Sequence, residues 1–296
     1  MKSILLTGAS GFVGKNLIGF LKGFYIIDQL KRDCQVHINQ MAVIHLAGKA
    51  HDLKNVTDPS EYYKVNTELT KMLFDKFLES NANVFITLSS VKAAADEIDI
   101  PLTEDYIPNP ISHYGKSKLL AEEYILSKQI PDNKRVYILR PCMIHGPGNK
   151  GNLNLLYKIV SKGVPWPLGE FANKRSFCSI DNLCFIINEL IQNDQIPSGI
   201  YNIADDDAVS TSELIDLISD SIGTKASIWY IPQSLIKTVS RLGDIVRLPL
   251  NTERLNKLTE TYIVSNNKIK SAINKPLSLT AKEGLIKTFN SFKTNV

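Results

Sequence analysis

The sequence predicts an α/β fold, a doubly wound parallel sheet followed by a smaller mixed α/β lobe at its C-terminal end. Short, almost uninterrupted apolar runs recur through the first two thirds of the chain, and segments with helical periodicity separate them. Strands that are buried on both faces give such continuous runs, because neither face can be polar. Their alternation with helices is typical of a parallel sheet that has helices on both sides.

The expected elements follow one another in a regular order. Six apolar runs are the candidate strands: SILL at 3–6, FYII at 24–27, AVIHLA at 42–47, VFITLSS at 84–90, VYILRP at 136–141 and GIYNIAD at 199–205. Four stretches have helical periodicity: 14–22, 59–80, 113–127 and 179–192. Ser210 and Glu213 have the spacing of a capping box, which predicts that a further helix begins there.

The regular pattern breaks up into loops and mixed segments after about residue 145. We therefore expect residues 1–150, together with a returning segment at about 176–208, to form the sheet domain. Residues 151–175 and 209–296 then form the smaller lobe, for which a role in substrate binding is expected.

Composition and charge exclude several classes of protein. With 296 residues and 44% apolar content, the chain can bury a large core, and a net charge of +4 gives no basis for a nucleic-acid partner. The four cysteines lack metal-ligand spacing, so we expect no metal site and reduced, buried thiols. No apolar run approaches the roughly 20 residues that span a bilayer, nor does the N-terminal run resemble a signal peptide. We expect a soluble, unprocessed cytoplasmic protein without a membrane partner.

Three equally spaced glycines, Gly8, Gly11 and Gly14, directly follow the first candidate strand and precede a candidate helix. This context distinguishes a dinucleotide-binding turn from a flexible loop. The first glycine permits the tight turn, the second lets backbone N–H groups approach a pyrophosphate, and the third lets helix and strand pack closely. We expect a Rossmann-like NAD(P) site here, with Phe12 and Val13 of the turn also contacting the cofactor.

Asp28, at the end of FYIID, is the candidate ligand of the adenosine ribose, and a carboxylate there favours NAD over NADP. It lies only 14 residues beyond Gly14, and only fifteen residues separate it from Val43, so the helix and strand that usually wall the adenine pocket are expected to be trimmed. Lys31 and Arg32 could neutralise a 2′-phosphate. NADP therefore stays open as a second cofactor.

Tyr114 and Lys118 form a Y-x-x-x-K pair, which places the phenol and the ammonium on one helix face. Tyr124 and Lys128 form a second such pair. Only Tyr114 enters its helix beside the carboxyl end of a strand, where open α/β sheets bind ligands, and Ser90 closes the preceding strand 24 residues earlier. We expect Lys118 to lower the pKa of the Tyr114 phenol, so that Tyr114 can act as a base while Ser90 holds the same substrate oxygen.

Six further stretches resemble the extended branch of the short-chain dehydrogenase/reductase superfamily, in particular its UDP-glucose 4-epimerase-like nucleotide-sugar enzymes. They are VIHLAGKAH at 43–51, VNTELT at 65–70, LSSVKAA at 88–94, PLTEDYIPNP at 101–110, RPCMIHGPG at 140–148 and KRSFCSIDNL at 174–183. The TGxxGxxG turn and the Y-x-x-x-K pair are also similar to those of this superfamily.

The resemblance implies roles for several more residues. Leu46, Ala47 and Gly48 should border the cofactor, and Asn152 and Arg175 should contact the diphosphate of a nucleotide sugar. Arginine suits that role because its planar fork meets phosphate oxygens bidentately. Lys92 stands where many epimerases have a hydroxyl and is expected to face the substrate, whereas His145 replaces the family's tyrosine and is expected to be structural.

The resemblance implies NAD-dependent C4 epimerisation of a UDP-hexose or UDP-N-acetylhexosamine through a transient 4-keto sugar. A 4-keto reductase of a UDP-4-keto-6-deoxyhexosamine, with NAD(P)H, remains the nearest alternative. A non-catalytic cofactor-sensing protein is a third, although it would not need Ser90, Tyr114 and Lys118. Similar enzymes are homodimers that pair the helices expected at 59–80 and 113–127.

Overall fold

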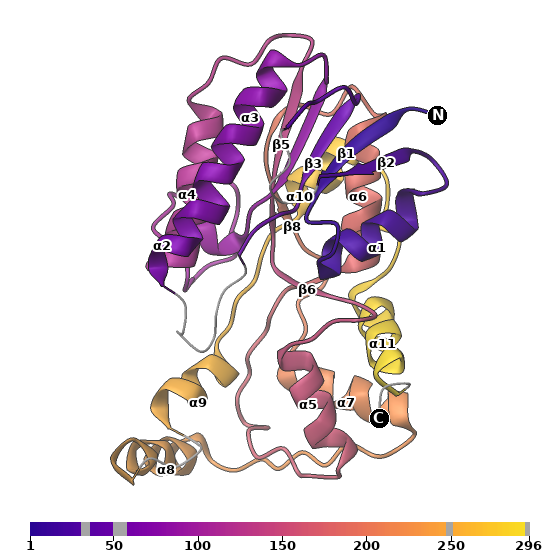
Figure 1. Cartoon of the computed structure of the whole chain (residues 1–296). Helices are drawn as coiled ribbons and strands as arrows, with labels where there is room; N and C mark the ends of the chain where they lie inside the picture. Colours follow the sequence, from indigo (N-terminus) through magenta and orange to yellow (C-terminus); the bar gives the residue numbers. More distant parts are fainter. Residues whose placement is uncertain (31–35, 50–57, 247–250, 294–296) are drawn as a thin grey trace.

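The computed structural model describes residues 1–30, 36–49, 58–246 and 251–293. Within these residues six strands form one parallel sheet in the order β2-β1-β3-β4-β5-β8 (Figure 1). The strands are β1 (Ser3–Thr7), β2 (Ile26–Gln29), β3 (Ala42–His45), β4 (Val84–Leu88), β5 (Arg135–Pro141) and β8 (Gly199–Ile203). The predicted doubly wound parallel sheet is confirmed.

The order of the strands reverses beside β1. The chain runs from β1 to β2 on one side and then returns to place β3 on the other side of β1. In open α/β sheets the loops leave a crevice at such a reversal, at the carboxyl ends of the strands. Thr7, which ends β1, and His45, which ends β3, therefore mark the edge of the sheet where a ligand is expected.

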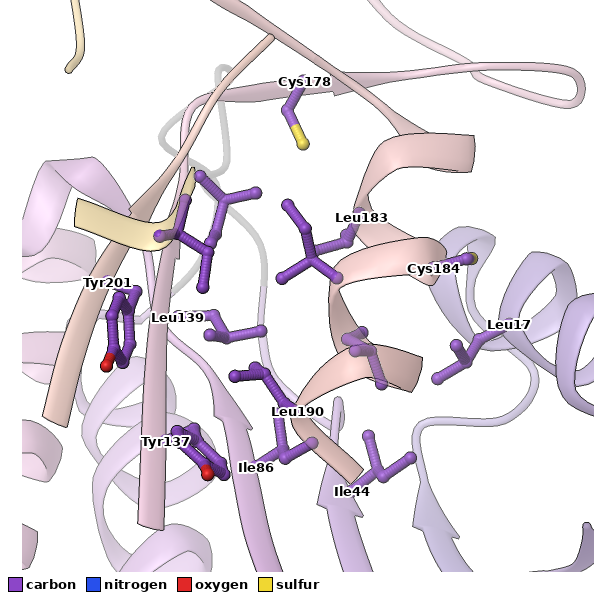
Figure 2. Close-up of a cluster of buried hydrophobic side chains, with 14 of the residues drawn as sticks. Leu17, Ile44, Ile86, Tyr137, Leu139, Cys178, Leu183, Cys184, Leu190 and Tyr201 are labelled. Atoms are coloured by element: carbon purple, nitrogen blue, oxygen red, sulfur yellow. The ribbon is translucent and has the colours of Figure 1, made fainter. Parts of the chain in front are cut away.

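Helices cover both faces of the sheet (Figure 1). One face packs against α1 (Phe12–Leu21), α6 (Ile180–Gln192) and α10 (Asn267–Ile273), and the other packs against α3 (Leu69–Glu79) and α4 (His113–Leu126). Alternate strand residues serve the two faces: Ile4 and Leu6 belong to one apolar cluster and Leu5 to the other. Figure 2 shows the first cluster, in which Leu183 and Leu190 of α6 lie over the strands.

The path between β3 and β5 contains the short elements that frame the site. The single long helix expected at 59–80 is divided into α2 (Pro59–Tyr62), the π-helix η1 (Tyr63–Glu68) and α3. The 3₁₀ helix η2 (Val91–Ala93) follows β4 at once. These elements pack against α4, which carries the Y-x-x-x-K pair.

The smaller lobe lies below the carboxyl ends of the strands in Figure 1. Its helices are α5 (Asn152–Ser161), α7 (Thr211–Ile222), α8 (Gln233–Val246), α9 (Thr252–Thr259) and α11 (Ala281–Phe292), and the two-stranded pair of β6 (Met143–His145) and β7 (Phe177–Ser179) lies where the lobe joins the sheet domain. A third apolar cluster, which includes Leu153, Ile218 and Phe289, holds α5, α7 and α11 together. The predicted capping box is confirmed, because the Ser210 side chain and the Glu213 side chain bond each other's backbone N–H groups.

Several sequence-based boundaries differ from the structure. Helix α1 begins at Phe12 rather than at residue 14, and strand β2 begins at Ile26 rather than at residue 24. Leu30 and residues 36–41, the described part of the segment between β2 and β3, contain neither helix nor strand. Lys31, Arg32 and Cys34 lie outside the described residues. No helix in the described part of the chain has the length and apolarity needed to cross a bilayer.

Candidate active site

Two of the three glycines, Gly8 and Gly14, occupy positions that only glycine can take. Gly8 has a φ of 71°, and a Cβ on it would lie 2.6 Å from the Ala47 backbone nitrogen. A Cβ on Gly14 would lie 2.3 Å from the Gly8 carbonyl oxygen. Contacts this short to backbone atoms leave no space for a side chain, so the loops after β1 and β3 touch directly.

The turn leaves the N-terminus of α1 open for an anion. Gly11 is the N-cap of α1, and in this fully described helix neither a capping side chain nor an acidic first-turn residue meets the free N–H groups. Such groups and the helix dipole bind phosphate. Phe12 and Val13 follow Gly11 in the first turn. The residues present thus fit the pyrophosphate of a dinucleotide.

A chain of buried hydrogen bonds ties the end of β3 to the end of β1. The Ala47 N–H donates to Thr7 Oγ1 at 3.1 Å, and Thr7 Oγ1 lies 2.7 Å from His45 Nδ1. On the other side of the ring, His45 Nε2 lies 2.9 Å from Thr70 Oγ1, which itself donates to the Asn66 carbonyl. Since the Thr70 proton is used, His45 must donate from Nε2 and accept at Nδ1. Burial, and to a smaller extent the charge of Lys118, lowers the pKa of His45 to about 3, so the ring is neutral.

Asn66 is a site residue that the sequence did not single out. It lies in the π-helix η1, where its Oδ1 accepts the Lys49 N–H at 2.8 Å and its Nδ2 donates to Ser117 Oγ at 3.0 Å. A Cβ on Gly48 would lie 3.0 Å from both Asn66 Oδ1 and Lys118 Nζ. The loop after β3, η1 and α4 therefore meet at Gly48. The motif VNTELT was the available signal, but it gave no role to its asparagine.

Ser90 and Tyr114 come together at the carboxyl end of β4. Ser90 caps η2, and Tyr114 lies in the first turn of α4 behind the N-cap Ser112. The Ser90 hydroxyl lies close enough to the Tyr114 phenol to lower its pKa by hydrogen bonding. Tyr114 also packs edge-on against Tyr62 of α2, with ring centroids 6.1 Å apart. The predicted pairing of a strand-end serine with this tyrosine therefore exists in the structure.

The predicted lowering of the Tyr114 pKa is wrong for the protein without ligand. Burial raises the pKa of Tyr114, and the Ser90 hydrogen bond offsets this only in part. Lys118 Nζ donates instead to the Leu88 carbonyl oxygen at 2.8 Å. Burial lowers the pKa of Lys118 to about 8, although the negative charge of Glu122 opposes the change. Burial thus disfavours the charged form of both groups, as expected where charges leave water.

The second Y-x-x-x-K pair lies elsewhere on α4. The Tyr124 hydroxyl donates to the Asp75 carboxylate of α3 at 2.8 Å, and Lys128 Nζ lies 4.4 Å from the Tyr124 ring centroid. This arrangement joins two helices on the outer side of the sheet. Tyr124 therefore has a packing role, and Tyr114 is the candidate for chemistry.

A buried ion pair joins α4, one turn beyond Lys118, to strand β5. Glu122, one turn beyond Lys118 on α4, accepts two hydrogen bonds of 3.1 Å from the Arg140 Nε on β5, and its carboxylate also bonds the Arg140 Nη2 and the Ser89 hydroxyl. Both charged side chains are about 2% exposed. A buried pair of this kind is costly to break, because the remaining charge has no partner.

Lys92 and Arg175, both expected to face substrate, lie in one cluster around Tyr262. Lys92 Nζ donates to the Asp96 carbonyl oxygen and lies 4.5 Å from the Tyr262 ring centroid, and burial lowers its pKa. Arg175 forms an ion pair with Glu260 at 3.1 Å and also donates to the Glu260 carbonyl at 3.1 Å. Arg175 therefore engages a carboxylate of its own chain here.

The remaining predicted residues occupy the edges of the site. Asn152 is exposed and begins α5, with Gly151 as the N-cap. Asp28 is exposed on β2 and accepts a hydrogen bond of 2.8 Å from Gln40. His145 is fully buried, with Nδ1 2.9 Å from Thr288 Oγ1 and Nε2 3.4 Å from Asp205 Oδ2, in keeping with a structural role. No group of residues suited to a metal ion occurs in the described ranges.

A glycine turn at the reversal of a parallel sheet, followed by Ser90, Tyr114 and Lys118, defines an extended short-chain dehydrogenase/reductase. The chain belongs to the NAD dependent epimerase/dehydratase family, whose model matches residues 22–204. It is therefore an NAD(P)-dependent nucleotide-sugar epimerase or a related oxidoreductase.

Individual relatives agree with this class. A UDP-glucose 4-epimerase of Vibrio cholerae is 30% identical over 324 residues, which cover 98% of this chain and 95% of that protein. A GDP-6-deoxy-D-mannose reductase of Pseudomonas aeruginosa is 26% identical over 73% of this chain and 79% of its own length. The crystal structure of UDP-N-acetylglucosamine 4-epimerase from Bacillus cereus has the same fold, with a TM-score of 0.76 at 19% identity over 98% of each chain.

Proposed function

We propose that this protein interconverts C4 epimers of a UDP-hexose or UDP-N-acetylhexosamine through a transient 4-keto sugar. The observation that carries the proposal is the placement of the Ser90 hydroxyl beside the Tyr114 phenol, with Lys118 one turn further along α4, at the same edge of the sheet as the glycine turn. Both hydroxyls can address a single sugar oxygen, which suits proton transfer to and from the oxygen at C4.

The residues divide the reaction between them. Tyr114 takes the proton of the 4-hydroxyl and later returns it to the 4-keto oxygen, while the Ser90 hydroxyl hydrogen-bonds that same oxygen and keeps it in line. Lys118 is the third member of the set, one turn beyond Tyr114 on α4. Bound NAD would supply the hydride acceptor and donor for C4, and its positively charged ring would favour the phenolate.

The same chain supplies the cofactor site. We assign Gly8, Gly11, Phe12, Val13 and Gly14 to the pyrophosphate, because α1 offers it free N–H groups. Asp28 is assigned to the adenosine ribose and favours NAD over NADP. The loop of Leu46, Ala47 and Gly48 is assigned to the nicotinamide ribose, next to Tyr114 and Lys118.

We assign the nucleotide sugar to the space between the sheet domain, residues 1–150 with about 176–208, and the lobe, residues 151–175 and 209–296. Arg175 is the candidate for the diphosphate, and Glu260 holds its guanidinium until an anion replaces that carboxylate. Lys92, two residues beyond Ser90, and Asn152 at the start of α5 complete the proposed substrate contacts.

A homodimer in the cytoplasm is also part of the proposal. Helices α3 and α4 have exposed apolar side chains on the outer side of the sheet, Met72, Leu120 and Leu126, each more than 40% exposed. Pairing with a second copy would cover them.

The experiment that tests the function uses the purified protein without added cofactor. UDP-N-acetylglucosamine and UDP-glucose are incubated separately, and the sugar products are resolved by proton NMR of the anomeric signals. Appearance of the C4 epimer at the expense of the substrate supports the proposal, because bound NAD is regenerated in each cycle. If protein that contains NAD forms the C4 epimer of neither UDP-N-acetylglucosamine nor UDP-glucose, the proposal is contradicted.

The reductase alternative has support of its own in the similar GDP-6-deoxy-D-mannose reductase and in the small number of residues between Asp28 and Val43, from which a trimmed adenine pocket is expected. Such an enzyme would consume NAD(P)H in proportion to product. A UDP-4-keto-6-deoxyhexosamine is therefore the second substrate to supply, with absorbance at 340 nm as the readout. Stoichiometric oxidation of NAD(P)H with this sugar alone would replace the epimerase proposal.

A further inference from the structure

Asp96 joins the two segments that carry Ser90 and Tyr114. It follows η2, the short helix that Ser90 caps. Its Oδ2 accepts the N–H of Ile111 at 2.7 Å and the N–H of Ser112 at 2.9 Å, and its Oδ1 accepts the Ser112 hydroxyl at 3.0 Å. One carboxylate therefore accepts three hydrogen bonds from the residues just before α4 begins.

These bonds fix the first turn of α4. The Ser112 hydroxyl gives its proton to Asp96, so its lone pair faces the Gly115 N–H, which donates to it at 3.1 Å. Ser112 is the N-cap of α4, and Tyr114 lies between it and Gly115. The orientation of the cap, and with it the turn that carries Tyr114, is thus set by the Asp96 carboxylate.

Direct packing brings the same two segments into contact. A Cβ on Gly115 would lie 2.3 Å from the Lys92 carbonyl oxygen, so the backbone of α4 rests on η2. The Asn109 N–H donates to the Ala94 carbonyl at 2.8 Å. Ser90 Oγ in turn accepts the Lys92 N–H at 3.2 Å. Ser90 and Tyr114 therefore belong to two capped turns that Asp96 and Gly115 hold together.

Asp96 is negatively charged at neutral pH. Burial alone would raise its pKa, but hydrogen bonds from Ser112 and Ile111 and the charge of Lys92 outweigh this and lower it. Hydrogen bonds to a carboxylate are about twice as strong as bonds between neutral groups. The three bonds can therefore resist a change in the relative position of η2 and α4.

We propose that Asp96 is a positioning residue for the reaction: its carboxylate fixes the Ser90 hydroxyl and the Tyr114 phenol at the separation in which both reach one substrate oxygen. This inference rests on the proposed function of that pair. Asp96 itself lies behind the turn and has no part in proton transfer.

The test compares Asp96→Ala and the milder Asp96→Asn with Glu97→Gln. Glu97 is the exposed neighbour in the same loop, and its charge also acts on Lys92, so this variant controls for the loss of one negative charge. We expect Asp96→Ala to lower kcat on the order of 10²-fold, because a misplacement of about 1 Å has that effect. KM and the Kd for NAD should stay within about threefold, and Asp96→Asn should fall in between.

A double-mutant cycle separates positioning from general stability. In a Ser90→Ala background the pair is already broken. Adding Asp96→Ala to this variant should lower kcat by a further factor of less than about three, because the effects of substitutions at residues that act as a unit are not additive. Full additivity of the two losses would overturn the proposal. Wild-type kcat in folded Asp96→Asn and Asp96→Ala would also overturn it.

A readout without substrate keeps this inference distinct from the proposed function. Hydrogen exchange of the Ile111, Ser112 and Gly115 amides should become much faster in Asp96→Asn and remain slow in Glu97→Gln. Unchanged protection would refute the positioning role of Asp96, even in an active enzyme. Lost protection in a protein that turns over none of the UDP-sugars would support the role of Asp96 in holding the two turns together and would refute the proposed reaction instead.

Discussion

The buried ammonium of Lys118 should make the protein less stable, and Lys118→Met should therefore stabilise the cofactor-free protein while abolishing turnover. Lys118 is buried, and its Nζ bonds only a backbone carbonyl among the described residues. Methionine retains the length and the apolar stem of lysine without the charge. The trade of stability for activity is typical of catalytic groups.

The size of the effect follows from the pKa of Lys118. Burial lowers that pKa from 10.5 to about 8. At about 1.4 kcal/mol for each tenfold change in proton affinity, this corresponds to about 3 kcal/mol of lost stability at pH 7. Removal of the ammonium also removes its bond to the Leu88 carbonyl, which was worth about 1 kcal/mol. The variant should therefore gain about 2 kcal/mol in the free energy of unfolding at pH 7.

The sign of the pH dependence is fixed by the same lowered pKa. Below pH 8 both the folded and the unfolded chain keep the proton on Lys118. Between pH 8 and 10.5 the folded chain has released it and the unfolded chain has not, so the free energy of unfolding of the wild type rises with pH. The advantage of Lys118→Met should therefore shrink as the pH rises through this window.

Urea unfolding of the cofactor-free protein at pH 7.0 and pH 9.5, pH values that bracket about 8, measures both effects. Lys116→Met, on the exposed side of the same helix, is the matched control and should change the unfolding free energy little at either pH. A destabilised Lys118→Met at pH 7.0, or an equal difference from the wild type at the two pH values, would refute the reasoning.

Three further variants test the site and its support. Tyr114→Phe should lower kcat by about 10²–10⁴-fold with NAD still bound, whereas Tyr124→Phe should keep near-normal turnover; equal losses in a rate assay would contradict the assignment. Gly14→Ala should abolish NAD binding in a fluorescence titration, since its Cβ would lie 2.3 Å from a backbone oxygen. Gly19→Ala, in an open part of the same helix, should instead bind NAD and gain about 0.5–1 kcal/mol. Glu122→Ala should lose about 3–5 kcal/mol in urea unfolding because it leaves a buried guanidinium unpaired; a loss below 1 kcal/mol would argue against the ion pair.

Much of the fold could be predicted because local signals agreed with the global arrangement. The continuous apolar runs arise because alternate strand residues such as Leu5 and Leu6 serve opposite helical layers. The glycine turn was recognisable from its place between a strand and a helix. The capping box at Ser210 depends on neighbouring residues alone, and the structure contains it as predicted.

The rest depended on contacts between residues far apart in the sequence. Arg175 and Glu260 form an ion pair although they lie 85 positions apart in the sequence, and no local pattern predicts that pair. The π-helix that turns Asn66 toward Lys49 interrupts a segment whose periodicity is helical throughout. The pKa of Tyr114 was predicted from its lysine neighbour alone, and burial, which only the packed structure reveals, had the larger effect.

The electrostatics of the site bear on when it is ready to react. Burial opposes the phenolate form of Tyr114, so loss of its proton is unfavourable unless positive charge is added near it. The neutral His45 beside Lys118 adds no such charge. The oxidised nicotinamide ring would carry a positive charge, and such a charge would lower the pKa of a nearby phenol. The same burial that favours the neutral phenol would thus make proton removal depend on the positive charge of the oxidised cofactor, which would couple the two halves of the proposed reaction.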